Sequence, residues 1–253
     1  MQLNRFNTPG VWIRRTEPNP DAKLRLFCLP YAGGGASLFR RWAEAVPPEI
    51  DILPIQLPGR EDRFSEAPFN RMFPLVRALV ESVYPWLDLP FAIFGHSLGA
   101  LVGFELARYL RWSLNRTPEH LFVSACPAPQ VSHQQSPIYA LPEPDFIAGI
   151  RQFHTVPPAF LEEPDLLELF LPLLRADFAV YETYIYTPEA PLECPITAFC
   201  GGNDPNASLL EVGAWHSQSS ISFIMRVFPG DHFFIHTSEK LLVDAIAEML
   251  INA

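Results

Sequence analysis

The pentapeptide Gly95-His96-Ser97-Leu98-Gly99 is the pattern in this chain that is most specific for chemistry. A serine with glycines two residues before and after it can occupy a sharp turn between a strand and a helix, where larger neighbours would collide. The apolar run Phe91–Phe94 precedes this turn, and a segment with helical spacing follows it. We therefore predict that Ser97 is a nucleophile presented on a strand–turn–helix elbow, rather than a serine that only caps a helix.

A serine hydroxyl is a weak nucleophile unless a base accepts its proton and an acid orients that base. His232 is the best-placed base, because it follows the last apolar run and the turn Pro229-Gly230-Asp231. In open α/β sheets, ligands bind at this edge of the strands. His236 stands just before the final helix and is assigned a structural role. His154 is assigned to the surface, with contact to a substrate as the alternative. The remaining downstream candidates are His120, His133 and His216.

Asp204 is predicted to be the acid that orients the base. It follows the apolar run 195–200 and the turn 201–203, which places it at the same sheet edge. Between residues 120 and 142 the chain has no carboxylate, which disfavours an acid after the preceding strand. Asp231 adjoins the base, but neighbouring side chains in a loop rarely face one another. The resulting chain order, serine then acid then histidine, is typical of α/β-hydrolases.

Three glycines stand in a row in the segment Leu29-Pro30-Tyr31-Ala32-Gly33-Gly34-Gly35, directly after the first apolar run. The sequence has neither a P-loop nor a dinucleotide-binding fingerprint, so these glycines do not indicate a phosphate site. In a serine hydrolase, a loop at this position and the residue after the nucleophile each supply one backbone N–H to the oxyanion hole. We predict that these donors are the amides of Ala32 and Leu98. A turn that needs glycine only for flexibility is the alternative.

Apolar runs alternate with segments of helical spacing along the chain, which predicts a mostly parallel central sheet with helices on both faces. The predicted strands are 24–29, 52–57, 91–94, 121–126, 195–200 and 222–228. The predicted helices of this alternation are 37–45, 69–86, 98–112 and 239–251.

The segment 127–191 breaks this alternation. It holds two helical patterns, 143–153 and 165–186, of which the second is interrupted by Pro172, and it holds no strand. About 65 residues is far longer than an ordinary connection between strands. We predict an inserted helical lid sub-domain, with a helical layer that only packs as the alternative. Residues 1–253 are accordingly predicted to form a single α/β-hydrolase domain with this insertion.

The composition of the 253-residue chain excludes several classes of protein. With 49% hydrophobic and 18% charged residues, the chain is too apolar for a disordered protein. A formal net charge of −10 argues against wholesale binding to nucleic acid or to anionic membranes. The charge is uneven, because residues 1–126 hold 14 basic and 12 acidic side chains whereas residues 127–253 hold 4 basic and 16 acidic ones.

Two further features indicate the cytoplasm as the expected location. The polar start of the chain predicts no signal peptide, and no apolar run approaches the ~20 residues that span a bilayer. The cysteines show no CxxC or Cys/His metal pattern, and three of them lie in or at the end of apolar runs. We predict that they are small buried side chains in a reducing compartment, and we expect no metal site and no cofactor. The four cysteines are Cys28, Cys126, Cys194 and Cys200.

Six segments between about Leu24 and Leu250 agree in order and spacing with one known family: LPYAGGGAS, IQLPGREDRF, FGHSLGA, LRADFAVYETY, GGNDP and FPGDHFFIH. Together they resemble the stand-alone type II thioesterases that accompany nonribosomal peptide and polyketide synthases. The resemblance implies an α/β-hydrolase fold with a helical lid, and hydrolysis that clears stalled or misprimed acyl groups from the phosphopantetheine arms of carrier proteins. The family triad falls on Ser97, Asp204 and His232. Tyr31 stands where many hydrolases have histidine, which is expected to matter little because the backbone of Ala32 is the donor.

The implied partner is an acyl or peptidyl carrier protein that bears acyl-phosphopantetheine, and the protein is expected to act as a monomer. Carrier proteins of this class are usually acidic. We hypothesise that some arginines of the N-terminal half contact the carrier or its phosphate, with ordinary solvated charges as the alternative. The candidates are Arg14, Arg15, Arg40, Arg41, Arg60 and Arg63. Substrate choice is expected to depend on the lid sequence and on Pro157-Pro158.

Three other functions share parts of this pattern. A malonyl-type acyltransferase also carries GHSLG, but it needs a longer chain and an N-terminal GQGSQ-like motif that this sequence lacks. A carboxylester hydrolase, or an acyl-CoA thioesterase of the same fold, would share the triad. A catalytically silent binding protein of this fold is the third alternative, because a fold does not determine a function, and the intact triad argues against it.

Overall fold

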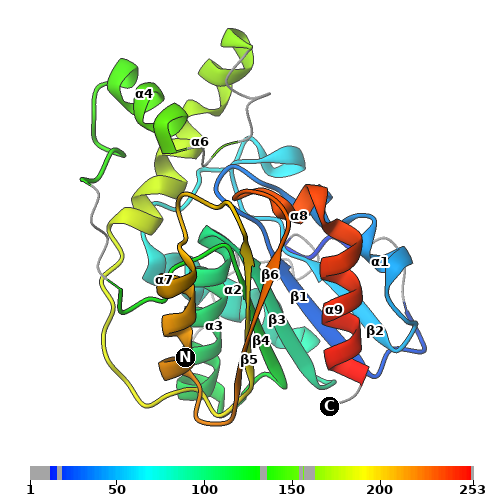
Figure 1. Ribbon diagram of the computed structural model, residues 1–253. Helices are drawn as coiled ribbons and strands as arrows, with labels where there is room; N and C mark the ends of the chain where they lie inside the picture. Colours follow the sequence, from blue (N-terminus) through cyan, green and yellow to red (C-terminus); the bar gives the residue numbers. More distant parts are fainter. Residues whose placement is uncertain (1–11, 16–18, 132–135, 154–155, 157–162, 252–253) are drawn as a thin grey trace.

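The computed structural model describes residues 12–15, 19–131, 136–153, 156 and 163–251 (Figure 1). Within these residues six strands form one sheet in the order β2-β1-β3-β4-β5-β6, and every neighbouring pair is parallel. The predicted parallel sheet is therefore confirmed. The strands are β1 (Leu24–Leu29), β2 (Ile50–Pro54), β3 (Phe91–His96), β4 (His120–Ser124), β5 (Ile196–Gly201) and β6 (Phe223–Phe228).

Helices cover both faces of this sheet, as Figure 1 shows. One face carries α2 (Met72–Val83), α3 (Leu98–Leu114) and α7 (Leu209–Gly213), and the other carries α1 (Trp42–Ala45), α8 (Phe234–Thr237) and α9 (Glu239–Ile251). The reason is visible along β1, whose side chains alternate between two hydrophobic clusters. Phe27 and Leu29 pack with α2 and α3, whereas Leu26 and Cys28 pack with α1 and α9. Since successive strand residues point to opposite faces, a run that is apolar throughout can bury both faces.

Two strands differ from their predicted form. β2 begins and ends earlier than the predicted 52–57, because the chain after Pro54 pairs with the N-terminal segment through an antiparallel bridge from Ile55 to Ile13. β6 was expected to be covered on both faces, but Ile224 and Val227 are exposed. This strand lies at the edge of the sheet, where it has one neighbouring strand and less helical cover.

Two helical predictions also need correction. The segment 37–45 forms a 3₁₀ turn over Ala36–Phe39 and the short α1, not one helix. Phe39 and Trp42, three residues apart, still reach the same hydrophobic cluster, with ring centroids 5.0 Å apart, which explains the helical spacing. Pro172 does not interrupt its helix, because α6 (Pro164–Glu182) runs through it.

The segment between β4 and β5 contains α4 (Glu143–Phe153) and α6, and no strand is found among its described residues. Figure 1 shows both helices projecting from the end of the sheet at which α8 lies. The carboxylate of Glu182, at the end of α6, accepts hydrogen bonds from the backbone N–H groups of Ile138 and Tyr139 at 3.0 and 2.8 Å. These bonds join the start of the insertion to its second helix.

All four cysteines are buried free thiols, as predicted. Burial raises the pKa of Cys126 and of Cys194 to about 12. Both side chains are therefore protonated and poorly nucleophilic near neutral pH. No helix in the described part of the chain is both long and apolar enough to cross a bilayer.

His120 makes the stability of the sheet depend on pH. Its ring stacks on Phe122 at 4.2 Å and its Nε2 lies 2.8 Å from Thr197 Oγ1. Burial lowers the pKa of His120 from the ordinary 6.5 to about 4. The unfolded chain therefore binds a proton below about pH 6.5 that the native protein does not bind until about pH 4, so stability falls as the pH falls through this window.

His120→Gln keeps a polar side chain that cannot titrate. We predict that, between pH 7 and pH 5, the free energy of unfolding of this variant falls by about 2 kcal/mol less than that of the wild type. Urea unfolding at the two pH values measures this difference. The matched control is His216→Gln, because His216 is exposed. The free energy of unfolding of this control should fall between the two pH values by as much as that of the wild type. Parallel pH dependence of His120→Gln and the wild type would contradict the account.

Candidate active site

Ser97 lies on the sharp turn between β3 and α3 that the sequence predicts. Its backbone has φ 53° and ψ −118°, a conformation that costs a non-glycine residue about 1–3 kcal/mol. Bare backbone surrounds this turn. A Cβ on Gly95 would lie 2.1 Å from the carbonyl oxygen of Gly99, and a Cβ on Gly99 would lie 2.3 Å from that of Leu29. The amide of Ser97 also donates to the carbonyl of Ser124 at 2.7 Å.

The structure brings Ser97, His232 and Asp204 into one hydrogen-bonded chain. His232 Nε2 lies 3.0 Å from Ser97 Oγ, and its Nδ1 lies 2.9 Å from Asp204 Oδ2. The carboxylate can only accept, so Nδ1 carries the proton and Nε2 is free to accept the serine proton. Both side chains of the His232–Asp204 pair are almost fully buried, at 4% and 0% exposed. These distances suit a nucleophile, a base and an orienting acid.

His96 is a residue of this site that the sequence analysis missed. Its Nε2 lies 2.8 Å from the backbone carbonyl of His232, and its Nδ1 lies 2.9 Å from Ser124 Oγ. Since a carbonyl only accepts, Nε2 carries the proton and Nδ1 accepts from the serine hydroxyl. Burial, with a smaller contribution from His232, holds the pKa of His96 well below its usual range, so the ring is neutral. A position inside the elbow motif was the only available signal.

The glycine-rich loop lies against the first turn of α3. The same close approach that excludes a Cβ from Gly99 brings this turn within contact of the carbonyls of Leu29 and Pro30. Ala32, in the loop, and Leu98, the first residue of α3, are both nearly buried. Among the described residues, neither amide donates to a protein acceptor. Both amides therefore have no protein acceptor among the described residues, as the predicted oxyanion donors require.

The other candidate bases and acids lie outside this chain of hydrogen bonds. His236 Nε2 contacts the hydroxyl of Tyr31 at 3.0 Å, so it links α8 to the glycine-rich loop. Asp231 Oδ1 accepts from the amide of Phe233 at 2.8 Å instead of facing His232. His120 starts β4, at the opposite end of the strand from the elbow. His133, His154 and Pro157-Pro158 lie outside the described residues.

Two of the six arginines that were candidates for carrier contact are buried, which removes them from that set. Arg60 pairs with Asp177, and both side chains are 3% exposed. Arg63 is buried too, binds Glu66 at 2.6 Å and lies 4.4 Å over the ring of Trp12. The charge of Arg60 is thus compensated inside the protein, and that of Arg63 by the carboxylate of Glu66, whose side chain is 44% exposed. Arg40 and Arg41, in contrast, are exposed.

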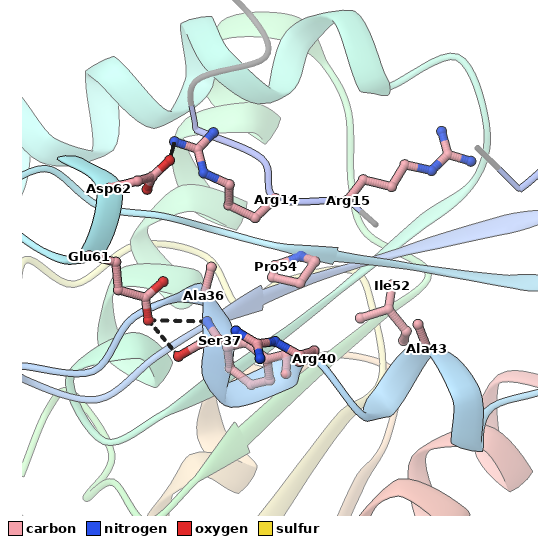
Figure 2. A pocket seen from close by; sticks show the side chains of 11 residues that line it. Arg14, Arg15, Ala36, Ser37, Arg40, Ala43, Ile52, Pro54, Glu61 and Asp62 are labelled. Carbon is pink, nitrogen blue, oxygen red and sulfur yellow. Dashed lines mark hydrogen bonds and ion pairs between the residues drawn. The ribbon is translucent and has the colours of Figure 1, made fainter. Parts of the chain in front are cut away.

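A hollow of about 250 Å³ lies next to the 3₁₀ turn that follows the glycine-rich loop. Figure 2 shows the side chains that line it. The lining of this hollow does not include Ser97, His232 or Asp204. Its charges are mixed. Arg14 pairs with Asp62 at 2.5 Å, and Glu61 accepts from the hydroxyl of Ser37, also at 2.5 Å. The hollow is therefore not a strongly cationic site, although Arg40 lines its rim.

A family model for the thioesterase domain matches residues 24–253, from the first residue of β1 to the end of the chain. The chain belongs to the thioesterase family. This thioesterase is 42% identical to the gramicidin S biosynthesis protein GrsT of Aneurinibacillus migulanus, over 94% of this chain and 93% of GrsT.

Two solved structures extend the comparison to the fold. The type II thioesterase BorB, from the borrelidin biosynthetic cluster, is 35% identical with a TM-score of 0.83, over 94% of this chain and 95% of BorB. YbtT, a type II thioesterase from the yersiniabactin nonribosomal peptide and polyketide synthase pathway, is 30% identical with a TM-score of 0.82, over 94% of this chain and 97% of YbtT. The protein is thus a thioester hydrolase of the α/β-hydrolase fold.

We predict that Gly99→Ala lowers the free energy of unfolding of this thioesterase by about 3 kcal/mol, because the added methyl group meets backbone that cannot move aside. Urea unfolding followed by tryptophan fluorescence measures the change. Gly213→Ala is the matched control, since Gly213 lies in helix α7 and a Cβ there would have no heavy atom within 4 Å. This substitution should be neutral or slightly stabilising. Equal effects of the two substitutions would show that close packing at the elbow is not required.

Proposed function

We propose that this thioesterase hydrolyses acyl thioesters on the phosphopantetheine arm of acyl or peptidyl carrier proteins, and so removes stalled or misprimed acyl groups from a nonribosomal peptide or polyketide synthase. The observation that carries the proposal is the hydrogen-bonded chain from Asp204 through His232 to Ser97 in a member of the thioesterase family. The names of BorB and YbtT, both type II thioesterases of biosynthetic systems, support the assignment to carrier-bound substrates.

The first half of the proposed reaction is acyl transfer to the protein. His232 Nε2 accepts the proton of Ser97 as Oγ attacks the thioester carbonyl, and the carbonyl oxygen becomes an oxyanion. The amides of Ala32 and Leu98 are the proposed donors to that oxyanion. The C–S bond then breaks, His232 returns the proton to the leaving sulfur, and the phosphopantetheine thiol departs. Backbone donors of this kind are each worth about 3–4 kcal/mol of barrier.

The second half is hydrolysis of the acyl-Ser97 ester. Water loses a proton to His232 as its oxygen attacks the ester carbonyl, and the same two amides receive the charge. Collapse of this intermediate releases the carboxylic acid and returns the proton to Ser97 Oγ. Asp204 holds the imidazole in the Nδ1–H tautomer through both halves, consistent with the 2.9 Å contact. Every group that these steps need belongs to the chain, the substrate or water.

We propose that the segment 127–191 serves as the lid of this site. Its helix α6 contacts the glycine-rich loop directly, because a Cβ on Gly33 would lie 2.7 Å from Leu174 Cδ2. Its described helices also project from the end of the sheet at which α8 lies (Figure 1), and α8 begins two residues after His232. A lid in this place would cover the acyl chain. We further propose that the protein acts as a cytoplasmic monomer, a location that its buried free thiols suit.

We predict that kcat/KM for an acyl-carrier substrate is at least tenfold higher than kcat/KM for the matching acyl-CoA. The difference from the p-nitrophenyl ester should be larger still. The reason is that only the carrier adds a protein surface to the contacts. Stopped assays with equal acyl chains measure the three values. Ser97→Ala should abolish all three activities. A carrier preference below tenfold would remove the case for a synthase partner, and retained hydrolysis in Ser97→Ala would contradict the triad.

Arg40 and Arg41 are the exposed members of the arginine set that directly follow the glycine-rich loop and its 3₁₀ turn. We propose that these two side chains contact the acidic carrier. Among the described residues, Arg41 has one long ion pair, with Glu239 at 3.7 Å, and its side chain is 81% exposed, so its charge is available to a partner. Surface charges of this kind act mainly on the rate of association.

The double substitution Arg40→Glu and Arg41→Glu should lower kcat/KM for the acyl-carrier substrate by about fivefold at low salt and leave the p-nitrophenyl ester unaffected. The matched control, Arg71→Glu with Arg77→Glu, makes the same change in net charge on α2, on the opposite face of the sheet. Equal losses in the two double variants would indicate an effect of net charge alone.

A further inference from the structure

The backbone of the glycine-rich loop is held by side chains from two distant segments. The N–H of Gly33 donates to Asp177 Oδ2 at 2.7 Å. The carbonyl of Gly34 accepts from Arg60 Nη1 at 3.1 Å. Asp177 lies in α6, in the predicted lid, and Arg60 lies in the turn after β2. Two consecutive residues of the loop are therefore fixed from outside it.

Arg60 and Asp177 also bind each other through two parallel hydrogen bonds. Nη1 lies 2.9 Å from Oδ2 and Nη2 lies 2.8 Å from Oδ1, with both side chains almost completely buried. A bidentate pair of this kind fixes direction as well as distance. If either residue of the pair moved away, the other would remain as an uncompensated buried charge. The pair and the loop backbone thus form one unit that joins three segments of the chain.

This unit holds the amide of Ala32 in place from both sides. Gly34 N–H donates to the carbonyl of Tyr31 at 2.9 Å, which closes a turn with Ala32 and Gly33 at its centre. Gly33 has φ 78°, the left-handed conformation that such a turn needs at this position. Fixing the N–H of Gly33 fixes the peptide plane that follows Ala32, and closure of the turn fixes the one before it. Asp177 therefore holds the peptide plane next to the one that contains the Ala32 N–H, and the closed turn couples the two planes.

We infer that Asp177 and Arg60 are positioning residues, which hold the Ala32 amide in the geometry of an oxyanion donor. Because Asp177 belongs to α6, this geometry depends on whether α6 lies against the glycine-rich loop. The inference rests on the proposed function, in which Ala32 supplies one of two donors. Withdrawal of α6 would release Gly33 and weaken the donor. Full activity accordingly belongs to the state in which α6 lies against the glycine-rich loop.

Asp177→Asn is the first test, because it keeps the shape of the side chain and removes the charge that fixes Arg60. The substrate is an acyl N-acetylcysteamine thioester, which needs no carrier. We expect kcat to fall about 10- to 100-fold while KM changes less than threefold, because the donor acts on the oxyanion and not on the bound thioester. Inhibition by an acyl trifluoromethyl ketone, whose adduct with Ser97 carries an oxyanion, should weaken by a similar factor. The pH profile should not move, since the His232–Asp204 contact is untouched.

Arg60→Lys is the second variant, since an ammonium group cannot bind both carboxylate oxygens in the same fork. It should show the same pattern as Asp177→Asn. Glu182→Gln is the matched control, because Glu182 is another carboxylate of α6 that accepts backbone N–H groups, but from Ile138 and Tyr139. Its kcat and its inhibition constant should stay within threefold of the wild type when all variants are assayed below their melting temperatures.

Three results would overturn the inference: wild-type kcat in both variants, a loss confined to KM, or an equal loss in Glu182→Gln. Failure of both variants to fold would also overturn it, because it would assign the pair a role in stability alone. Ser97→Ala separates this inference from the proposed function. If Ser97→Ala is inactive while both positioning variants are fully active, only the inference fails. If Ser97→Ala hydrolyses the thioester, the proposed function fails.

Discussion

Close packing of bare backbone around Ser97 is the constraint on which the rest of the active site depends. A Cβ on Gly95 or on Gly99 would lie within 2.3 Å of a carbonyl oxygen, so the first turn of α3 can approach both β3 and the loop that leaves β1 only without those side chains. This approach holds Ser97 at φ 53°. It also brings Leu98, with its free amide, next to the glycine-rich loop. One steric condition thus positions Ser97 and one of the two proposed donors.

Hydrogen bonds from a second layer of residues then limit how far each reacting group can move. His96 donates to the backbone carbonyl of His232, so the base is held at its main chain as well as by Asp204 at its ring. Asp177 does the same for the glycine-rich loop from α6. Ser97, His232 and Asp204 therefore lie at one edge of the sheet, while α6 supports the backbone of the glycine-rich loop. A site of this kind is organised before the substrate arrives, which is the condition for electrostatic stabilisation of a transition state.

The parts of the site that were predictable from the sequence depend on local spacing. Glycines two residues from Ser97 indicate an elbow, and a strand followed by a turn indicates where Asp204 and the base lie. The parts that were missed depend on contacts between distant residues. Arg60 was expected on the surface, but its partner Asp177 is 117 residues away, and no local pattern reports that burial. The exposure of β6 was missed for the same reason, since an apolar run does not show whether its strand lies at an edge.

Ser97 can act as the nucleophile only if His232 and Asp204 activate its hydroxyl. Reaction with a fluorophosphonate, followed by peptide mass spectrometry, tests this most directly, because the reagent modifies a serine only where a base activates the hydroxyl and the adduct is stable. The account predicts a single adduct on Ser97, formed in step with the loss of thioester hydrolysis and absent from His232→Ala. Loss of activity with Ser97 unmodified, or full activity with Ser97 modified, would contradict it.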